Sequence, residues 1–232
     1  MKTESSRLAA SIDRRSATEQ VAAALRDAIL SGQFLPGTPL RDVQLAEEIG
    51  VSRNTIREAT RTLVAEGLVR YKHNRGVEVT ELSKQDIDEL YQARAVLEWA
   101  GITILVAARS ERVFQTLAQL VDRIEGAFAD GDVAGVLEGD RGFHAILVSQ
   151  YRNSRLEHCY ASLQQELQLA LSLTERSSVE LGRERDDHRI LLDAIRSGDP
   201  AEARTALEEH LARGVSEVHR LRELVARLRS GR

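Results

Sequence analysis

Three histidines and one aspartate in the second half of this 232-residue chain have types and spacing suited to binding a divalent metal. Asp140 and His144 are four residues apart, which places a carboxylate and an imidazole one turn apart on one helix face. His188 lies in DDHRILLDAIRSG and His210 in LEEHLARG, so we expect four ligands from three helices to converge in a helical bundle. Three imidazoles and one carboxylate suit Zn²⁺, Ni²⁺ or Mn²⁺.

Simpler interpretations of this cluster stay open. D-x-x-x-H is a weak pattern, and a lone histidine near apolar neighbours is more often a core or surface residue than a ligand. The other histidines, His73, His158 and His219, have no partners at ligand spacing and are expected at the surface. A metal with open positions could also activate water in an enzyme. We find no HExxH motif, nucleophile elbow or phosphate loop beside it, so we expect a protein that is not an enzyme.

A helical scaffold must position these residues. Between residues 83 and 229 the apolar positions recur with helical spacing, and we find no convincing strand pattern. Ser83-x-x-Asp86 resembles a capping box, and residues 199–202 combine an N-cap, a proline at the first helical position and an acid at N3. The last helix should end near Leu228. Helix stops are expected at Gly131, near Asn153, near Gly182 and at Gly198.

Residues 40–76 have the pattern of a DNA-reading element. A short helix buries one face and stops at Gly50, because only glycine adopts positive φ without a Cβ penalty. Ser52 then caps a second helix, and after Gly67 two short alternating segments, 68–72 and 77–79, predict a hairpin wing. The apolar faces expected of the two helices are Leu45, Ala46 and Ile49 in the first and Ile56, Ala59 and Leu63 in the second.

Arginines line the outer face of the second helix. Arg53, Arg57 and Arg61 recur every four residues, so they form an unpaired basic edge that can enter a major groove and contact guanines or phosphates. Asn54 and Thr55 add neutral donors near the helix start. The alternative is a small helical subdomain whose charged face is only solvated.

Charge is distributed unevenly along the chain. The formal net charge is −4, but residues 1–80 hold 12 Lys and Arg against 10 Asp and Glu, whereas the remaining 152 residues hold 20 against 26. The basic share therefore lies with the DNA-reading element. Because this excess is small, affinity must come from arginines on one face and from two copies acting together. We expect a homodimer that binds a pseudo-palindromic operator in double-stranded DNA.

The sequence also favours a cytoplasmic protein without membrane segments. A single cysteine, Cys159, rules out an intramolecular disulfide framework and fits a reducing cytosol. No run of eighteen apolar residues appears, and the first fifteen residues lack the apolar core of a signal peptide. Residues 1–15 show no periodicity and are expected to be a disordered arm.

The stretch GxxLPGTPLRD…LAEEIGVSRNTIREATRTLVAEGLVRYKHNRGVEV resembles the winged-helix domain of the GntR family of bacterial transcription regulators, over roughly residues 18–80. The resemblance implies operator contacts for Arg53 and Arg57 and a wing tip at Gly76 in the minor groove. Many relatives carry an arginine where this chain has Val43, so Arg41 is expected to reach the same phosphate. The DNA-binding residues expected are Arg41, Ser52, Arg53, Asn54, Thr55, Arg57, Arg61, Arg75 and Gly76.

The segments ELYQARAVLEWAG, GDRGFHAIL…RNSRL, DDHRILLDAIRSGDPAEAR and EEHL resemble the FCD effector domain of the FadR subgroup of GntR regulators, across residues 83–228. This resemblance implies a bundle of six or seven helices, with a small carboxylate effector beside a metal bound by the four residues above. Arg94 corresponds to the arginine that faces the effector in many relatives. Its alternative role is a salt bridge to Glu98 one turn on.

Together these observations predict a mainly α protein. Residues 16–80 would form a winged helix-turn-helix domain with a small β-hairpin wing, and residues 81–232 an all-helical effector-binding and dimerisation domain. We expect a DNA-binding regulator, a repressor, that responds to a small organic acid at a metal site. The alternatives are a regulator that senses metal without an organic effector and a metal-dependent enzyme.

Overall fold

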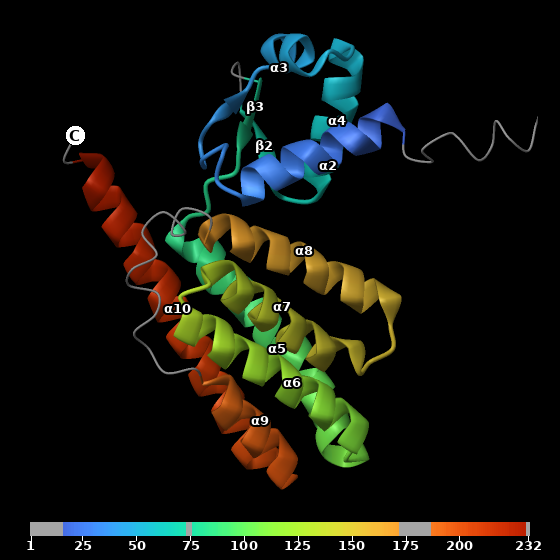
Figure 1. Ribbon diagram of the computed structural model, residues 1–232, viewed down its shortest axis with the longest axis vertical. Coiled ribbons are helices and arrows are strands. Elements are labelled where there is room, and N and C mark those ends of the chain that lie inside the picture. The colour runs from blue at the N-terminus through green and yellow to red at the C-terminus, as the bar shows by residue number, and fades with distance from the viewer. Residues whose placement is uncertain (1–15, 73–75, 172–186, 231–232) are drawn as a thin grey trace, which may run out of the picture. The chain divides into compact units, whose positions relative to one another are not determined.

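The computed structural model describes residues 16–72, 76–171 and 187–230 (Figure 1). The expected disordered arm, residues 1–15, and the expected DNA contact Arg75 lie outside these ranges. The chain divides into two compact units between Thr80 and Glu81. The described residues are mainly helical with one small antiparallel sheet, which confirms the predicted fold class.

The first unit contains three helices and three short strands in its described part. Strand β3 pairs antiparallel with β1 on one side and with β2 on the other. The β2–β3 hairpin is the predicted wing, whereas β1 was not predicted because two residues are too short to show alternation. The elements are α2 (Ala17–Leu30), β1 (Pro39–Leu40), α3 (Asp42–Ile49), α4 (Arg53–Ala65), β2 (Val69–Lys72) and β3 (Gly76–Val79).

Local sequence signals set the ends of α3 and α4. Gly50 ends α3 in the left-handed conformation with φ of 76°. Ser52 caps α4 by accepting a hydrogen bond from the Thr55 backbone N–H at 3.1 Å. The expected apolar faces are buried except at Ile49, which is 42% exposed. This prediction was wrong because Ile49 is the last residue of α3, beyond the turn that packs against the first unit's core.

The second unit contains six helices in its described part, within the predicted six or seven (Figure 1). The capping box at Ser83 is present, and Asp199 Oδ1 accepts a hydrogen bond from the Ala201 backbone N–H at 2.8 Å at the start of α10. The stop expected near Gly182 lies outside the described residues. The helices are α5 (Lys84–Ala108), α6 (Glu111–Asp130), α7 (Val133–Ser149), α8 (Ser154–Leu171), α9 (His188–Ser197) and α10 (Pro200–Ser230).

The boundary between α5 and α6 was not predicted. It falls at Arg109, a non-glycine residue with φ of 46°, so neither glycine nor proline marks it in the sequence. Arg109 Nη2 donates to the backbone oxygen of Ser197 at 3.3 Å, at the end of α9. The conformation is therefore supported by a residue 88 positions away, which local sequence patterns do not reveal.

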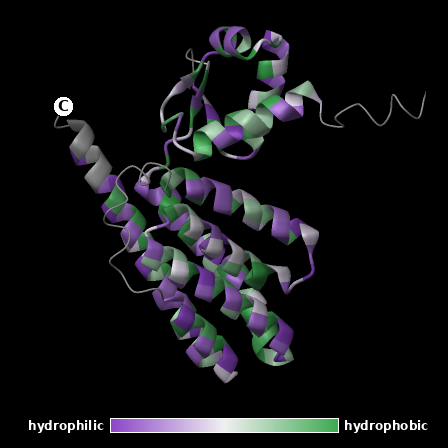
Figure 2. Ribbon diagram, viewed as in Figure 1, coloured by the Kyte–Doolittle hydropathy of each residue, from purple (hydrophilic) through white to green (hydrophobic). Residues whose placement is uncertain are grey.

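Helices α5 and α7 approach each other closely at Gly101. A Cβ added at this residue would lie 1.8 Å from the backbone oxygen of Leu147, so only glycine fits. Hydrophilic and hydrophobic residues are mixed along every helix of the bundle (Figure 2), as expected for amphipathic helices around one core. Across the described ranges, no helix is long and apolar enough to cross a bilayer.

Candidate metal centre and DNA interface

The four residues predicted to bind metal lie together in the helical unit. One coordinating atom from each of Asp140, His144, His188 and His210 lies within 4.8 Å of the other three. His144 Nε2 is 3.0 Å from His210 Nε2, and Asp140 Oδ1 is 3.1 Å from His188 Nε2 and 3.6 Å from His144 Nε2. The residues come from α7, α9 and α10, which are three helices, as expected.

These separations fit a bound divalent cation. With bonds of about 2.1 Å, neighbouring ligand atoms lie about 3.0 Å apart in an octahedral site and about 3.4 Å apart in a tetrahedral one. Burial, with the nearby His188 and His144, lowers the pKa of His210 well below its usual value. Burial alone would raise the pKa of the Asp140 carboxyl, but the nearby His144 and His188 hold this pKa well below its usual range. A neutral imidazole and an ionised carboxylate are the forms that coordinate metal.

A buried carboxylate orients one of the candidate ligands. Glu98 Oε2 lies 2.8 Å from His144 Nδ1, and Glu98 Oε1 accepts from the Tyr160 hydroxyl at 2.6 Å. Gln164 Nε2 donates to the same hydroxyl at 2.9 Å. A carboxylate that accepts from Nδ1 fixes the tautomer in which Nε2 is free to coordinate. Sequence patterns did not reveal this role, because Glu98 and His144 are 46 residues apart.

Arg94 makes the predicted alternative contact and also faces the candidate metal centre. Its Nε donates to Glu98 Oε1 at 2.9 Å, and Arg94 itself is 2% exposed. It lines a cavity of about 200 Å³ together with Asp140, His188 and His210. A guanidinium carries five N–H donors, so one bond to Glu98 is compatible with further bonds to a ligand.

The remaining histidines are placed differently. His158 is exposed on α8, as expected. His219 is not the solvated residue that was predicted, because its Nε2 lies 2.7 Å from Asp88 Oδ1 and its side chain is 16% exposed. This pairing joins α10 to α5, elements too distant in sequence for the spacing to show it. His73 lies outside the described residues.

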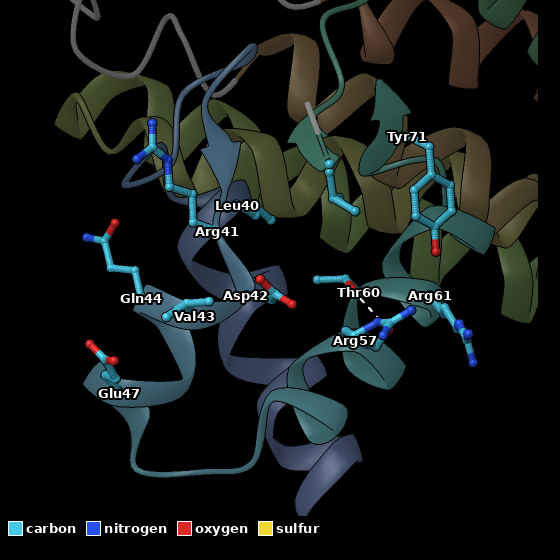
Figure 3. Close-up of a pocket in the computed structure, with 12 residues that line it drawn as sticks. Leu40, Arg41, Asp42, Val43, Gln44, Glu47, Arg57, Thr60, Arg61 and Tyr71 are labelled. Carbon is cyan, nitrogen blue, oxygen red and sulfur yellow. Dashed lines mark hydrogen bonds between the residues drawn. The ribbon is translucent and has the colours of Figure 1, made fainter. Parts of the chain in front are cut away.

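A groove of about 640 Å³ lies between α3, α4 and the wing in the first unit. Arg57 and Tyr71 are on one side of it, and Arg41 and Gln44 are on the other (Figure 3). Tyr71, on β2, is 62% exposed and was not among the expected contacts. Four of the residues expected to contact DNA line this groove and are exposed, namely Arg41, Arg57, Arg61 and Gly76. Ser52, Arg53 and Asn54 are exposed as well, and Thr55 is half-buried.

The basic edge of α4 was predicted to be unpaired, and this prediction was wrong for two of its three arginines. Arg53 Nη2 lies 3.3 Å from Asp42 Oδ2, and Arg61 Nη1 lies 2.6 Å from Glu58 Oε1. Arg57 has no ion pair within the described ranges. The Arg53 pair depends on the fold, since Asp42 is eleven residues away at the start of α3. Arg57 is therefore the recognition-helix arginine most available to a ligand in this structure.

Comparison with known proteins identifies the family. Residues 17–79 match the bacterial regulatory proteins of the gntR family, and residues 89–213 match the FCD domain. The chain belongs to the GntR family and carries an FCD domain. This confirms both resemblances seen in the sequence.

The similar proteins described next are named as transcriptional regulators. A probable repressor of a D-xylose utilisation operon from Paenarthrobacter nicotinovorans is 30% identical over 83% of this chain and 86% of its own length. The galactonate operon repressor of Escherichia coli (strain K12) is 27% identical over 89% of this chain and 97% of its own length. The regulator YdhC of Bacillus subtilis (strain 168) is 31% identical over 58% of this chain and 60% of its own length.

A solved structure shows the same architecture. A GntR transcriptional regulator from Rhodococcus sp. RHA1 superposes with a TM-score of 0.74 and 30% identity, over 88% of this chain and 98% of that one. Since relatives and structural neighbours are regulators, this GntR protein is a transcriptional regulator and not an enzyme. The metal-dependent enzyme considered from the sequence is therefore set aside.

Proposed function

We propose that this GntR protein is a transcriptional repressor whose affinity for its operator is controlled by a small carboxylate bound in the FCD domain. One observation carries the proposal: Arg94 and three of the four clustered metal-ligand candidates line the same cavity. Relatives that repress operons for D-xylose and galactonate support a role in carbon metabolism.

Asp140, His144, His188 and His210 would hold a divalent cation, Zn²⁺, Ni²⁺ or Mn²⁺. When bound, the cation would supply open coordination positions for oxygen atoms of the effector. Arg94 would donate charge-assisted hydrogen bonds to the effector carboxylate, with Glu98 holding the guanidinium in place.

Operator recognition would use the basic face of α4 and the wing. Arg57 and Arg53 would contact bases or phosphates in the major groove, and Gly76 would let the wing tip approach the minor groove. Two copies would bind half-sites about one helical turn of DNA apart, so we propose a homodimer on a pseudo-palindromic operator. A regulator that binds chromosomal DNA would act in the cytoplasm.

The effector would act by changing the population of two arrangements of the dimer. A ligand shifts an equilibrium only by its differential affinity for two states, so the acid must bind better to the arrangement that fits the operator poorly. We therefore expect the acid to release operator DNA.

The test is to titrate small hydroxy and keto acids into the protein–operator complex and to follow fluorescence anisotropy of the DNA at fixed salt. Wild type, chelator-treated protein and Arg94→Ala are compared, with Arg123→Ala on α6 as a control for loss of charge. We expect release only from the metal-loaded wild type and the control. An acid that changes operator affinity equally in all four samples would show that this cavity is not the effector site.

A second candidate function is metal sensing without an organic ligand. The observation that favours it is the buried ion pair between Arg94 and Glu98, which gives the arginine a partner in the absence of an effector. Operator affinity that follows free metal concentration alone, with no effect of any acid, would favour this candidate.

A further inference from the structure

Tyr71 is an aromatic side chain that the first unit leaves in solvent, with 62% of its surface exposed. Val69 and Tyr71 are two residues apart on β2, so their side chains lie on the same face of the sheet. Val69 is 2% exposed, so this face packs on the core of the unit. Tyr71 lies further along the hairpin, opposite Val77, where it lines the groove between α3, α4 and the wing.

The two cations of β2 lie on the other face of the sheet. Arg70 and Lys72 alternate with Tyr71 along the strand, and neither lines the groove. Arg70 Nη2 is 3.0 Å from Glu78 Oε1, and Lys72 Nζ is 3.0 Å from Glu78 Oε2. Within Val69–Lys72, Tyr71 is therefore the residue whose side chain offers a hydrogen-bond donor to the groove.

Arg61 meets this tyrosine from the recognition helix, α4. Both side chains line the groove, and the ring of Tyr71 extends from the wing toward the part of α4 that carries Arg61 (Figure 3). The Glu58 carboxylate and, after it, the Tyr71 hydroxyl raise the pKa of the Arg61 guanidinium. The hydroxyl of the wing and the guanidinium of the helix therefore lie beside each other.

The position of Arg61 along α4 separates it from the residues that enter the major groove first. It lies eight residues after Arg53, about 12 Å further along the helix axis. Recognition helices contact base edges mainly with their N-terminal residues, and the major groove is about 12 Å wide. A helix that enters the groove at Arg53 thus leaves Arg61 near the edge of the groove, where the phosphates lie.

Resting on the operator recognition proposed above, we infer that Tyr71 and Arg61 together bind one phosphate of the DNA backbone. A tyrosine hydroxyl beside a guanidinium turns a lone pair toward its N–H groups and keeps its own proton for an anion. Arg61 supplies the charge, because its exposed pair with Glu58 opens at low cost. The shared phosphate fixes the helix and the wing in one register on the duplex and carries no sequence information.

The experiment measures binding of the full chain to two duplexes by fluorescence anisotropy over a range of salt concentrations. One duplex is an operator that the wild type selects from a random-sequence pool, and the other is an unrelated duplex of equal length. Tyr71→Phe should weaken binding to both duplexes about threefold to tenfold for each chain bound, because a hydrogen bond to the phosphate is lost. The slope of log affinity against log salt concentration should not change, because a phenol carries no charge.

Arg61→Ala should weaken binding and also lower the salt slope by about 0.9 for each chain on the duplex, because one phosphate charge is no longer neutralised. In the Arg61→Ala background, Tyr71→Phe should have a smaller effect than in the wild type, since the two residues share one phosphate. The matched control is Tyr151→Phe in the second unit, where the tyrosine is 39% exposed, and it should bind as the wild type does. Thermal melts establish that each variant is folded.

The outcomes separate this inference from the proposed function. Unchanged affinity in Tyr71→Phe, or full additivity with Arg61→Ala, overturns the shared phosphate. A loss confined to the operator also overturns it, because that result makes Tyr71 a contact to a base. If Arg57→Ala loses operator affinity while Tyr71→Phe does not, the proposed operator recognition stands without this inference. If the wild type prefers no duplex from the pool, the proposed recognition fails, and binding to the unrelated duplex still decides the phosphate contact.

Discussion

Arg94 and His144 lie on different helices and share one acceptor, the carboxylate of Glu98. Oε1 of Glu98 accepts from Arg94 Nε at 2.9 Å, and Oε2 lies 2.8 Å from His144 Nδ1. Burial alone would raise the pKa of Glu98, but the nearby His144 and Arg94, together with hydrogen bonds from His144 and Tyr160, lower it to about 2. The carboxylate is therefore ionised at neutral pH and links the candidate effector contact to a candidate metal ligand.

The first prediction concerns Glu98→Gln. The variant removes the charge that orients His144 and leaves Arg94 without its counter-ion, so metal affinity should fall about 10- to 100-fold. The measurement is competition with a chromophoric chelator. The control is Glu166→Gln on α8, a half-buried acid whose pKa is raised by burial and which is not part of this network. Equal metal affinity in the two variants would assign Glu98 a structural role only.

The second prediction concerns removal of the metal. Ligands from α7, α9 and α10 tie three helices together, so a cation at 100 times its Kd should stabilise the folded domain by about 2.7 kcal/mol. Chelation should therefore lower the midpoint of thermal unfolding of the wild type, whereas the midpoint of His188→Ala should be the same with and without chelator. His158 is exposed on α8, so His158→Ala should keep the wild-type difference between the two midpoints. Metal-independent melting of the wild type would argue against the site.

The third prediction concerns Arg57, which has no ion pair in the described part of the chain and lines the groove of the first unit. Arg57→Ala should weaken operator binding by about 1–3 kcal/mol if the side chain contacts a base. Gel shifts at controlled salt measure the effect, with Arg112→Ala on the helical unit as a control for total charge. Loss of affinity in the control equal to that of Arg57→Ala would mean that bulk charge dominates binding.

The fourth prediction concerns the pair between Arg53 and Asp42. Exposed ion pairs contribute at most about 1 kcal/mol, so the pair can open when DNA offers a phosphate or a guanine. Asp42→Asn should raise operator affinity severalfold, because it frees Arg53 and removes a negative charge from the DNA-facing surface. In the Arg53→Ala background the same change should have a smaller effect, which a double-mutant cycle measures. Full additivity would show that the two residues act independently.

The fifth prediction concerns Gly101, where α5 and α7 touch through their backbones. Gly101→Ala should destabilise the helical domain by about 1–3 kcal/mol, because the added methyl would overlap the Leu147 carbonyl. Gly126→Ala on α6 is the matched control, since nothing lies within 4 Å of a Cβ at that residue. The control should be neutral or stabilised by up to about 1 kcal/mol. Urea denaturation distinguishes these outcomes.

Sequence patterns were reliable where the determining interactions are local. Glycine stops and serine caps each lie within one helix or turn, and they predicted the element boundaries that the structure shows at Gly50, Ser83 and Gly198. The four-residue spacing of Asp140 and His144 likewise lies within one helix. The family resemblance supplied the distant partners His188 and His210, which spacing alone left as a weak hypothesis.

Patterns failed where contacts join distant parts of the chain. The break at Arg109, the ion pair of Arg53 and the pairing of His219 with Asp88 each depend on residues that only the folded chain brings close. Only one of the two contacts of Glu98 was predicted. Its partner Arg94 lies one turn away on the same helix, whereas His144 lies on a different helix.

The distribution of the candidate ligands along the chain has a consequence for how the domain folds. Asp140 and His144 lie within one helix and form their half of the site as soon as α7 is helical, whereas His210 is 70 residues beyond Asp140. Bringing that residue into place requires closure of a long loop and docking of α9 and α10, steps that are slow compared with helix formation. Metal added during refolding should therefore leave the early phases unchanged and be taken up in the last one.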